Sequence, residues 1–319
     1  MGPEGGPSKA RFGEEMNEAE IERFWAAHPC GDALVGGLDG RFGGDDERFF
    51  ESYDSWRYDL EGHIPACLDD MDVAGQRVLE IGLGQGAESE QLIRRGARWS
   101  GLDLTRESVN RVRRRLAVHD LPFDDVRAGS ALDIPWPDDS FDIVFSHGVL
   151  HHVPDILTAQ AEIHRVLKPG GKLVVMLYAR RSLNYLVSIA MVRRLALLAV
   201  YPLARLGLIH PQGIVGQHVR EASKVGLREY LRLEQFTHHS TDGPESPFAR
   251  VYDLDDVQRD FPSFRVERSF KRFMHAPPLP VHKLPGGSVM GWHLWVHLTP
   301  RHLAAAETAD QSVISQRSA

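Results

Sequence analysis

Glycine occupies every second position from Gly82 to Gly86, directly after an apolar segment that carries one acid, in the sequence VLEIGLGQG. Gly82, Gly84 and Gly86 allow a sharp turn and let a ligand approach the backbone where a Cβ would collide with it. A helix expected over about 87–95 would direct its free N–H groups toward a ligand on this loop. The stretch therefore predicts a ligand-binding loop between a strand and a helix.

Glu80 separates the two cofactors that commonly bind such a loop. A nicotinamide enzyme carries Gly-x-Gly-x-x-Gly or Ala, and Gly82, Gly84 and Ala87 satisfy the weaker form of that pattern. An acid two residues before the first glycine suits a cationic ligand, because its carboxylate would repel a pyrophosphate. S-adenosylmethionine carries an ammonium and a sulfonium group, so Glu80 favours this cofactor.

Further segments follow the loop in a fixed order, and each is typical of a strand end or a helix end. They are GLDLT at 101–105, ALDIPW at 131–136, DSFDIVF at 139–145, SHGVLHHVPD at 146–155 and EIHRVLKPGG at 162–171. Over residues 78–178 this series resembles the class I S-adenosylmethionine-dependent methyltransferases, particularly the type 11 group. The resemblance implies a Rossmann-like, doubly wound α/β fold with a mostly parallel seven-stranded sheet and an antiparallel last strand.

The resemblance also implies where the cofactor is held. Asp103 lies about 20 residues beyond the glycines, where an acid accepts hydrogen bonds from both ribose hydroxyls. Ser130 stands where family members usually carry an Asp that contacts the adenine amino group, and Asp133 is either a substitute for that contact or a turn residue. The expected cofactor-binding residues are Glu80, Gly82, Gly84, Gly86, Asp103, Leu104, Ser130, Ala131 and Ser146, with Arg57 and Tyr58 from the N-terminal region.

Two amphipathic helices are expected before the core, over about 18–27 and about 46–57. The resemblance implies that this N-terminal element covers the cofactor as a lid. Its aromatic residues Phe49, Phe50 and Tyr53 either face the sulfonium, where a cation–π contact contributes about 0.5–2 kcal/mol, or pack a helix face.

Methyl transfer from a sulfonium is an in-line displacement, for which the protein aligns the acceptor, removes its proton and excludes water. Histidine suits the removal of a hydroxyl proton near neutral pH. His147, His151 and His152 follow the expected fourth strand, and the last two would diverge by about 100° on a helix. We rank His151 first as the base, His152 second and His147 third, and expect Tyr178 and Arg180 to orient the acceptor.

The bulk composition narrows the class of protein further. The chain has 319 residues, of which 42% are hydrophobic and 25% charged, as is ordinary for a soluble globular protein. A formal charge of −7 argues against a general nucleic-acid binder. Cys30 and Cys67 cannot build a zinc site alone, and we predict no metal. The acidic start lacks an apolar signal sequence, so we expect a cytoplasmic protein.

The chain divides into five expected parts. They are a tail and helical lid over 1–72, the cofactor-binding core over 73–180, a helical substrate cap over 181–250, the last core helix and closing strands over 251–300, and a flexible tail over 301–319. Residues 182–209 are nearly all apolar, but Arg193, Arg194 and Pro202 interrupt them. We expect a pair of helices there that cover the substrate, with contact to a membrane surface as the alternative.

These features predict a methyltransferase that acts on a hydroxyl or amine of a small polar metabolite, such as a sugar- or amino-sugar-containing natural product. Methylation of a quinone or lipid at a membrane surface is the second hypothesis. A nicotinamide-dependent oxidoreductase and a non-catalytic binding module are hypotheses from other classes. The sequence leaves the acceptor and the oligomeric state open.

Overall fold

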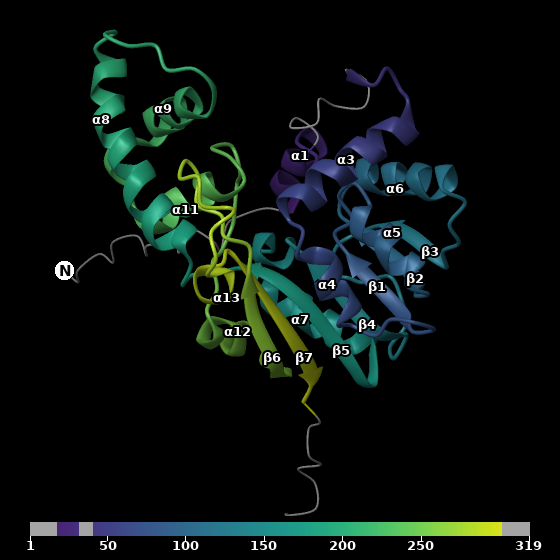
Figure 1. Ribbon diagram of the computed structural model, residues 1–319. Coiled ribbons are helices and arrows are strands. Elements are labelled where there is room, and N and C mark those ends of the chain that lie inside the picture. The colour runs from purple at the N-terminus through teal and green to yellow at the C-terminus, as the bar shows by residue number, and fades with distance from the viewer. Residues whose placement is uncertain (1–17, 32–40, 302–319) are drawn as a thin grey trace, which may run out of the picture.

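A seven-stranded sheet organises the computed structural model, which describes residues 18–31 and 41–301 (Figure 1). The strand order is β3-β2-β1-β4-β5-β7-β6, and β7 runs antiparallel to both of its neighbours. The strands are β1 (Arg77–Ile81), β2 (Arg98–Asp103), β3 (Asp125–Ala128), β4 (Phe141–His147), β5 (Leu167–Tyr178), β6 (Phe264–Arg272) and β7 (His293–Pro300). The predicted sheet, with its antiparallel last strand, is confirmed.

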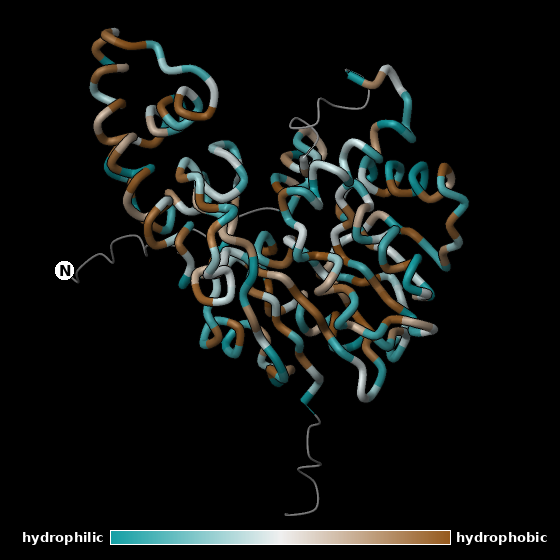
Figure 2. The backbone as a smooth tube through the Cα atoms, viewed as in Figure 1, coloured by the Kyte–Doolittle hydropathy of each residue, from teal (hydrophilic) through white to brown (hydrophobic). Residues whose placement is uncertain are grey.

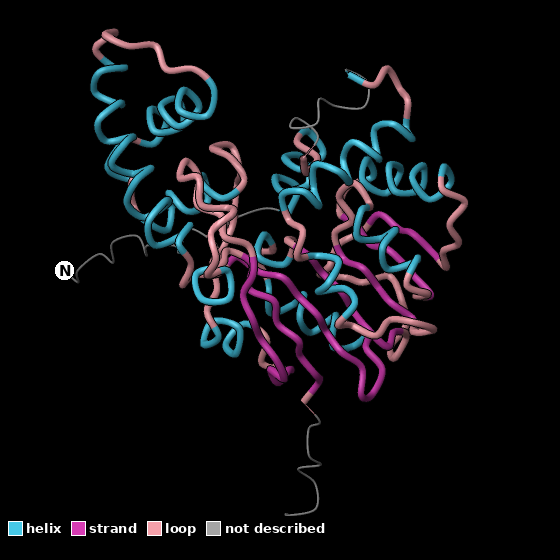
Figure 3. Tube along the Cα trace, viewed as in Figure 1, coloured by secondary structure: helices cyan, strands magenta, loops and turns pink. Residues whose placement is uncertain are grey.

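Alternate side chains of the central strands enter two separate cores, as the period-2 geometry of a strand requires. Leu79 and Val175 pack with α7 (Ile156–Val166) and α12 (Leu254–Asp260) on one face. Val78 and Val174 pack on the other face with three further helices. Those helices are α4 (Ile64–Asp69), α5 (Ala87–Arg94) and α6 (Arg106–Val118). Figure 3 shows the helices on both sides of the sheet.

The N-terminal lid consists of α1 (Glu18–Ala27) and α3 (Asp46–Leu60). Phe49 and Phe50 are fully buried in a cluster with Phe42, Tyr53 and Ala87, so the first two pack the helix face and do not point at a cofactor. The expected tails at the two ends of the chain lie outside the described residues, apart from Arg301.

Between β5 and α12, five helices form a projection from the body of the molecule (Figure 1). They are η3 (Asn184–Arg193), α8 (Arg194–Arg205), α9 (Gly213–Val225), α10 (Leu227–Tyr230) and α11 (Leu233–Thr241), and η3 and α8 are continuous. The expected break at Pro202 is wrong. Proline removes one backbone hydrogen bond, but Leu197 and Tyr201 pack into the core of this projection and hold the helix through that point.

Candidate active site

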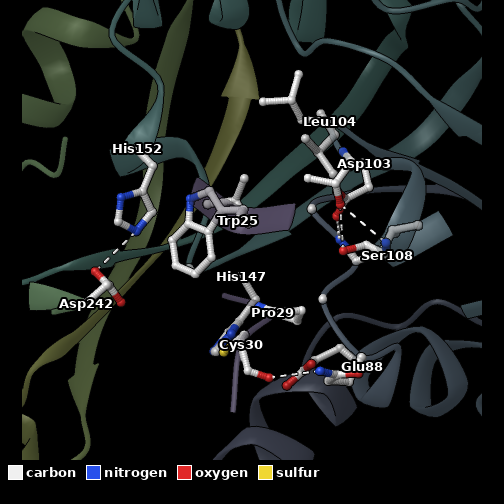
Figure 4. Close-up of a pocket in the computed structure, with 18 of the residues that line it drawn as sticks. Trp25, Pro29, Cys30, Glu88, Asp103, Leu104, Ser108, His147, His152 and Asp242 are labelled. Carbon is white, nitrogen blue, oxygen red and sulfur yellow. Dashed lines mark hydrogen bonds and ion pairs between the residues drawn. The ribbon is translucent and has the colours of Figure 1, made fainter. Parts of the chain in front are cut away.

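A cavity lies at the carboxyl ends of β1, β2, β4 and β5, where ligands bind in open α/β sheets (Figure 4). The antiparallel β7 brings its first residue, His293, to the same edge. The lid covers the cavity with Ile21, Trp25 and Tyr53. Asp242, at the end of α11, comes from the projecting helices, so residues from four distant parts of the chain meet here.

The three glycines of the loop serve different purposes. At Gly82, with φ +82°, an added Cβ would lie 2.1 Å from a methyl group of Val149, so the β1 and β4 loops touch only because Gly82 lacks a side chain. At Gly84, with φ +51°, an added Cβ would point into the cavity, with only Cys30 as near as 4.0 Å. Gly86 lies against α6 and does not line the cavity.

Asp103 faces the cavity at the end of β2. The N–H of Leu83 donates to its Oδ2 at 2.7 Å, and the N–H and hydroxyl of Thr105 donate to its Oδ1 at 2.8 Å. These bonds fix the carboxylate at the place where the sequence predicts a ribose.

Glu80 lies elsewhere than we predicted. It is 2% exposed, does not line the cavity and accepts a hydrogen bond of 2.8 Å from the Trp99 indole. Burial raises the pKa of Glu80 to about 8. The carboxyl group therefore supports the strand from behind the loop. The predicted direct contact between Glu80 and a cationic ligand is wrong.

A buried ion pair forms the floor of the cavity. Arg57 of α3 lies 2.6 Å from Glu88 of α5 and also 3.2 Å from Nδ1 of His147. Burial alone would raise the pKa of Glu88, but the Arg57 guanidinium holds that pKa below its usual range. Arg57, which was among the expected cofactor-binding residues, thus presents a guanidinium to the same cavity as the glycine loop.

Polar groups of a different kind occupy the opposite side (Figure 4). Nδ1 of His152 lies 2.6 Å from the Phe248 carbonyl oxygen and therefore carries a proton and donates. Its Nε2, left as an acceptor, lies 3.4 Å from Oδ2 of Asp242. The Tyr178 hydroxyl donates to Oδ1 of the same Asp242 at 2.7 Å. His152 is thus held in the tautomer that can accept a proton, next to a carboxylate that stabilises the charge.

His151, our first-ranked base, does not line the cavity. It is fully buried, its ring lies 3.8 Å from that of Tyr178, and burial holds its pKa well below the usual range. Both histidines belong to the short 3-10 helix η2 (Leu150–His152), where their ring centres lie only 4.3 Å apart, so the expected divergence of about 100° is not seen. Of these two histidines, only His152 lines the cavity.

Four more predicted residues lie outside the cavity lining, each for a visible reason. Ser130 contacts Glu18, and the Ser146 hydroxyl donates to the Ile81 carbonyl oxygen. Tyr58, in lid helix α3, packs against the aromatic cluster of the lid. Arg180 pairs with Asp256 at 2.9 Å. The predicted residues that do line it are Gly82, Gly84, Asp103, Leu104, Ala131, Arg57, His147, His152 and Tyr178. Gly129 and Ala131 flank Ser130 at the cavity wall.

Sequence reasoning missed Asp242, Glu88, Glu61 and His293. Asp242 stands in a turn-forming segment, and Glu88 in the first turn of a helix, where acids are common without a ligand. Neither position carries a signal that would distinguish it from a surface acid.

Three of the cavity residues could hold a metal ion by their donor types. One donor atom each of Glu61, His147 and His293 lies within 4.8 Å of the others. The Arg57 guanidinium, however, lies 3.7 Å from Glu61 and 3.2 Å from His147, and its charge opposes a second cation there. The group is better suited to polar contacts with a ligand.

Comparison with known proteins agrees with this geometry. Residues 79–175, which contain the glycine loop and the three histidines, match the family described as "Methyltransferase domain". The chain carries a methyltransferase domain. Its cofactor is S-adenosylmethionine, and the nicotinamide hypothesis falls, because the same glycines belong to the matched domain.

The relatives share this domain rather than their full length. A fatty-acid O-methyltransferase of Mycolicibacterium smegmatis is 41% identical over 102 residues, which cover 31% of this chain and 36% of that protein. Phthiotriol/phenolphthiotriol dimycocerosates methyltransferase 1 of Mycobacterium ulcerans is 38% identical over 106 residues, which cover 33% of this chain and 38% of that protein. A solved S-adenosylmethionine-dependent methyltransferase of Mesorhizobium loti is 18% identical, with a TM-score of 0.47, over 76% of this chain and all of that one.

The methyltransferase domain fits its cofactor at three described points. Gly84 leaves open the space that a Cβ would fill, Asp103 presents a fixed carboxylate for the ribose, and Arg57 presents a guanidinium for a carboxylate.

Gly84→Val is expected to abolish binding of S-adenosylhomocysteine, because the branched side chain would enter the cavity. Titration calorimetry measures the affinity. Gly75→Val is the matched control, since Gly75 has φ +73° and an added Cβ there meets nothing within 4 Å. Equal affinities of the two folded variants would contradict the assignment of the loop.

Asp103→Ala is expected to weaken S-adenosylhomocysteine by about 1.5–3 kcal/mol, the loss that accompanies removal of hydrogen bonds to a charged group. Glu80→Gln is the matched control and should bind almost normally, because that carboxyl is buried behind the loop and largely protonated below its pKa of about 8. Normal binding by Asp103→Ala would show that the ribose lies elsewhere.

The buried histidines predict a loss of stability in acid. Burial lowers the pKa of His63 to about 4 and that of His147 to about 3, whereas an unfolded histidine titrates near 6.5. Below pH 6.5 the unfolded chain therefore binds more protons than the folded one, and stability falls as the pH approaches 4. Each histidine should contribute about 2 kcal/mol of this loss between pH 7.5 and pH 5.

Urea unfolding of the wild type and of His63→Gln at these two pH values measures this loss. The variant should lose less stability on acidification. The same pH dependence in both proteins would show that His63 is protonated in the folded state.

Proposed function

We propose that the protein transfers a methyl group from S-adenosylmethionine to a hydroxyl group of a small-molecule acceptor, with His152 as the general base. The observation that carries this proposal is the arrangement of His152, Asp242 and Tyr178 on the side of the cavity away from Asp103. A hydroxyl must lose a proton when it is methylated, and this group of residues can take it.

Each residue of the site has a defined task in this proposal. Arg57 and Asp103 hold the cofactor, which supplies an activated methyl group when bound. Nε2 of His152 accepts the hydroxyl proton while Phe248 keeps the other nitrogen protonated. The Asp242 carboxylate then stabilises the imidazolium, and Tyr178 fixes the orientation of that carboxylate. Trp25 lies edge-on to His152 at 5.1 Å between ring centres and shields it from water.

A lipid acceptor is the second candidate. The printed names of two relatives refer to a fatty acid and to phthiotriol dimycocerosates, and the cavity wall includes apolar residues of the lid such as Ile21 and Trp25. A fatty-acid carboxylate is already ionised near neutral pH and needs no base. A fatty-acid acceptor therefore differs from a hydroxyl acceptor in that its turnover would not depend on His152.

His152→Ala is expected to lower turnover by about 10²–10⁴-fold, the usual range for loss of a general base. The affinity for S-adenosylhomocysteine should stay close to that of the wild type, because His152 lies on the acceptor side. Turnover is measured by mass gain of one methyl group across a panel of hydroxyl, amine and carboxylate acceptors, and the acidic limb of the pH–rate profile should disappear in the variant.

Two matched variants serve as controls. His151→Ala removes a buried neighbour of the same chemistry, and His164→Ala removes a ring that packs on Phe264, so both should act through stability alone. Wild-type turnover in all three variants would exclude His151 and His152 as the base and favour an amine or ionised acceptor.

A further inference from the structure

The projecting helices expose an unusual amount of apolar side chain. Over residues 184–225, here called the arm, the large hydrophobic residues exposed by more than two fifths include Leu186, Met191, Leu195, Leu198, Leu203, Leu206, Leu208, Ile214 and Val215. Leu195, Leu206 and Leu208 are 61%, 73% and 67% exposed. Figure 2 shows that much of the tube along α8 carries the hydrophobic colour, in the part that projects from the body of the molecule. Clustered exposure of this kind marks an interaction surface.

The exposed residues of α8 share one side of the helix. Leu195, Leu198, Pro202 and Leu206 recur at intervals of three and four residues, which places them in one stripe. Leu197 and Tyr201 lie between them in sequence and pack instead into the arm's own core. The stripe is therefore a second apolar side of the helix, because Leu197 and Tyr201 already form its buried side.

The arm is also positively charged, although the whole chain carries a net charge of −7. Residues 184–225 contain five Lys or Arg residues and a single acid, Glu221. Arg205, the last residue of α8, and Arg220, in the middle of α9, are both exposed. An anionic surface complements this combination, whereas the arm of a second copy would bring like charges together.

The same helix does not fit a spanning role. Asn184–Arg205 is long and apolar enough to cross a membrane. Its most apolar stretch of 18 residues has a mean hydropathy of 1.7, and 17% of that stretch is buried. At its centre, however, Arg193 donates to the Ser240 carbonyl and Arg194 to that of Leu231, both at 2.6 Å. These bonds tie one side of the helix to the rest of the protein, which leaves only the opposite side for lipid.

We infer that the arm inserts its leucine stripe into the surface of an anionic lipid bilayer while Arg205 and Arg220 contact the headgroups. A helix with one apolar and one protein-bound side lies in the interface and does not cross the bilayer. Asp242 follows α11 within the same group of helices, so docking of the arm brings the acceptor side of the cavity toward the membrane. The inference does not depend on the identity of the acceptor.

Vesicle flotation tests the inference on the full chain. The wild type should float with vesicles of equal parts phosphatidylcholine and phosphatidylglycerol, and binding should fall as salt is added. The triple variant Leu195→Asn, Leu198→Asn and Leu206→Asn should reduce the bound fraction by at least about tenfold, because three leucines lose their burial in lipid. Arg205→Gln and Arg220→Gln should each weaken binding to these vesicles by roughly fivefold.

The matched control replaces three leucines that are also exposed, by at least 40%, but lie outside the arm. Leu157, Leu254 and Leu284 are 54%, 40% and 55% exposed, and their triple Asn variant should float like the wild type. Failure of the wild type to float, or equal loss in both triple variants, would overturn the inference. The inference would also be overturned if sedimentation showed that the wild type is an oligomer and that the arm variant is a monomer. A second copy of the chain would then cover the stripe. None of these readouts requires turnover.

Discussion

The buried ion pair between Arg57 and Glu88 joins the two parts of the molecule that make the cofactor cavity. Glu88 belongs to the helix that follows the glycine loop, and Arg57 to the lid that covers it. Removal of either partner would leave an unpaired buried charge, at a cost of about 3–5 kcal/mol. A second buried arginine, Arg115, repeats the connection by bonding both Glu90 and Asp54. The lid is therefore tied to the domain by charge as well as by its aromatic cluster.

The cavity separates two kinds of polar chemistry. At one end, Asp103 and Arg57 hold opposite fixed charges about the glycine loop, which suits a ligand that itself carries both signs. At the other end, Nε2 of His152 lies 3.4 Å from Oδ2 of Asp242. The buried histidines near Arg57 stay uncharged because burial and that guanidinium both disfavour their protonation. In the proposed function, proton transfer therefore falls to His152 on the other side of the cavity.

The projecting helices share one hydrophobic cluster, in which Tyr185, Ile189 and Leu197 of the arm pack with Tyr230 and Phe236. This separate cluster lets the outer side of α8 remain apolar and exposed without disturbing the sheet. It also places Asp242 at the cavity, so the same group of helices completes the active site and presents the leucine stripe.

Local sequence determined the sheet, the glycine loop and the cofactor, because the patterns that define them span only a few residues. The end of β2 at Asp103, the lid helix that begins at Glu18 and the antiparallel last strand all agree with the structure. Only tertiary structure decided the acceptor side. The choice between His151 and His152 depends on how η2 packs against Tyr178, and Asp242 reaches the cavity from far along the chain. Such contacts follow from the packing of distant elements, which no local spacing records.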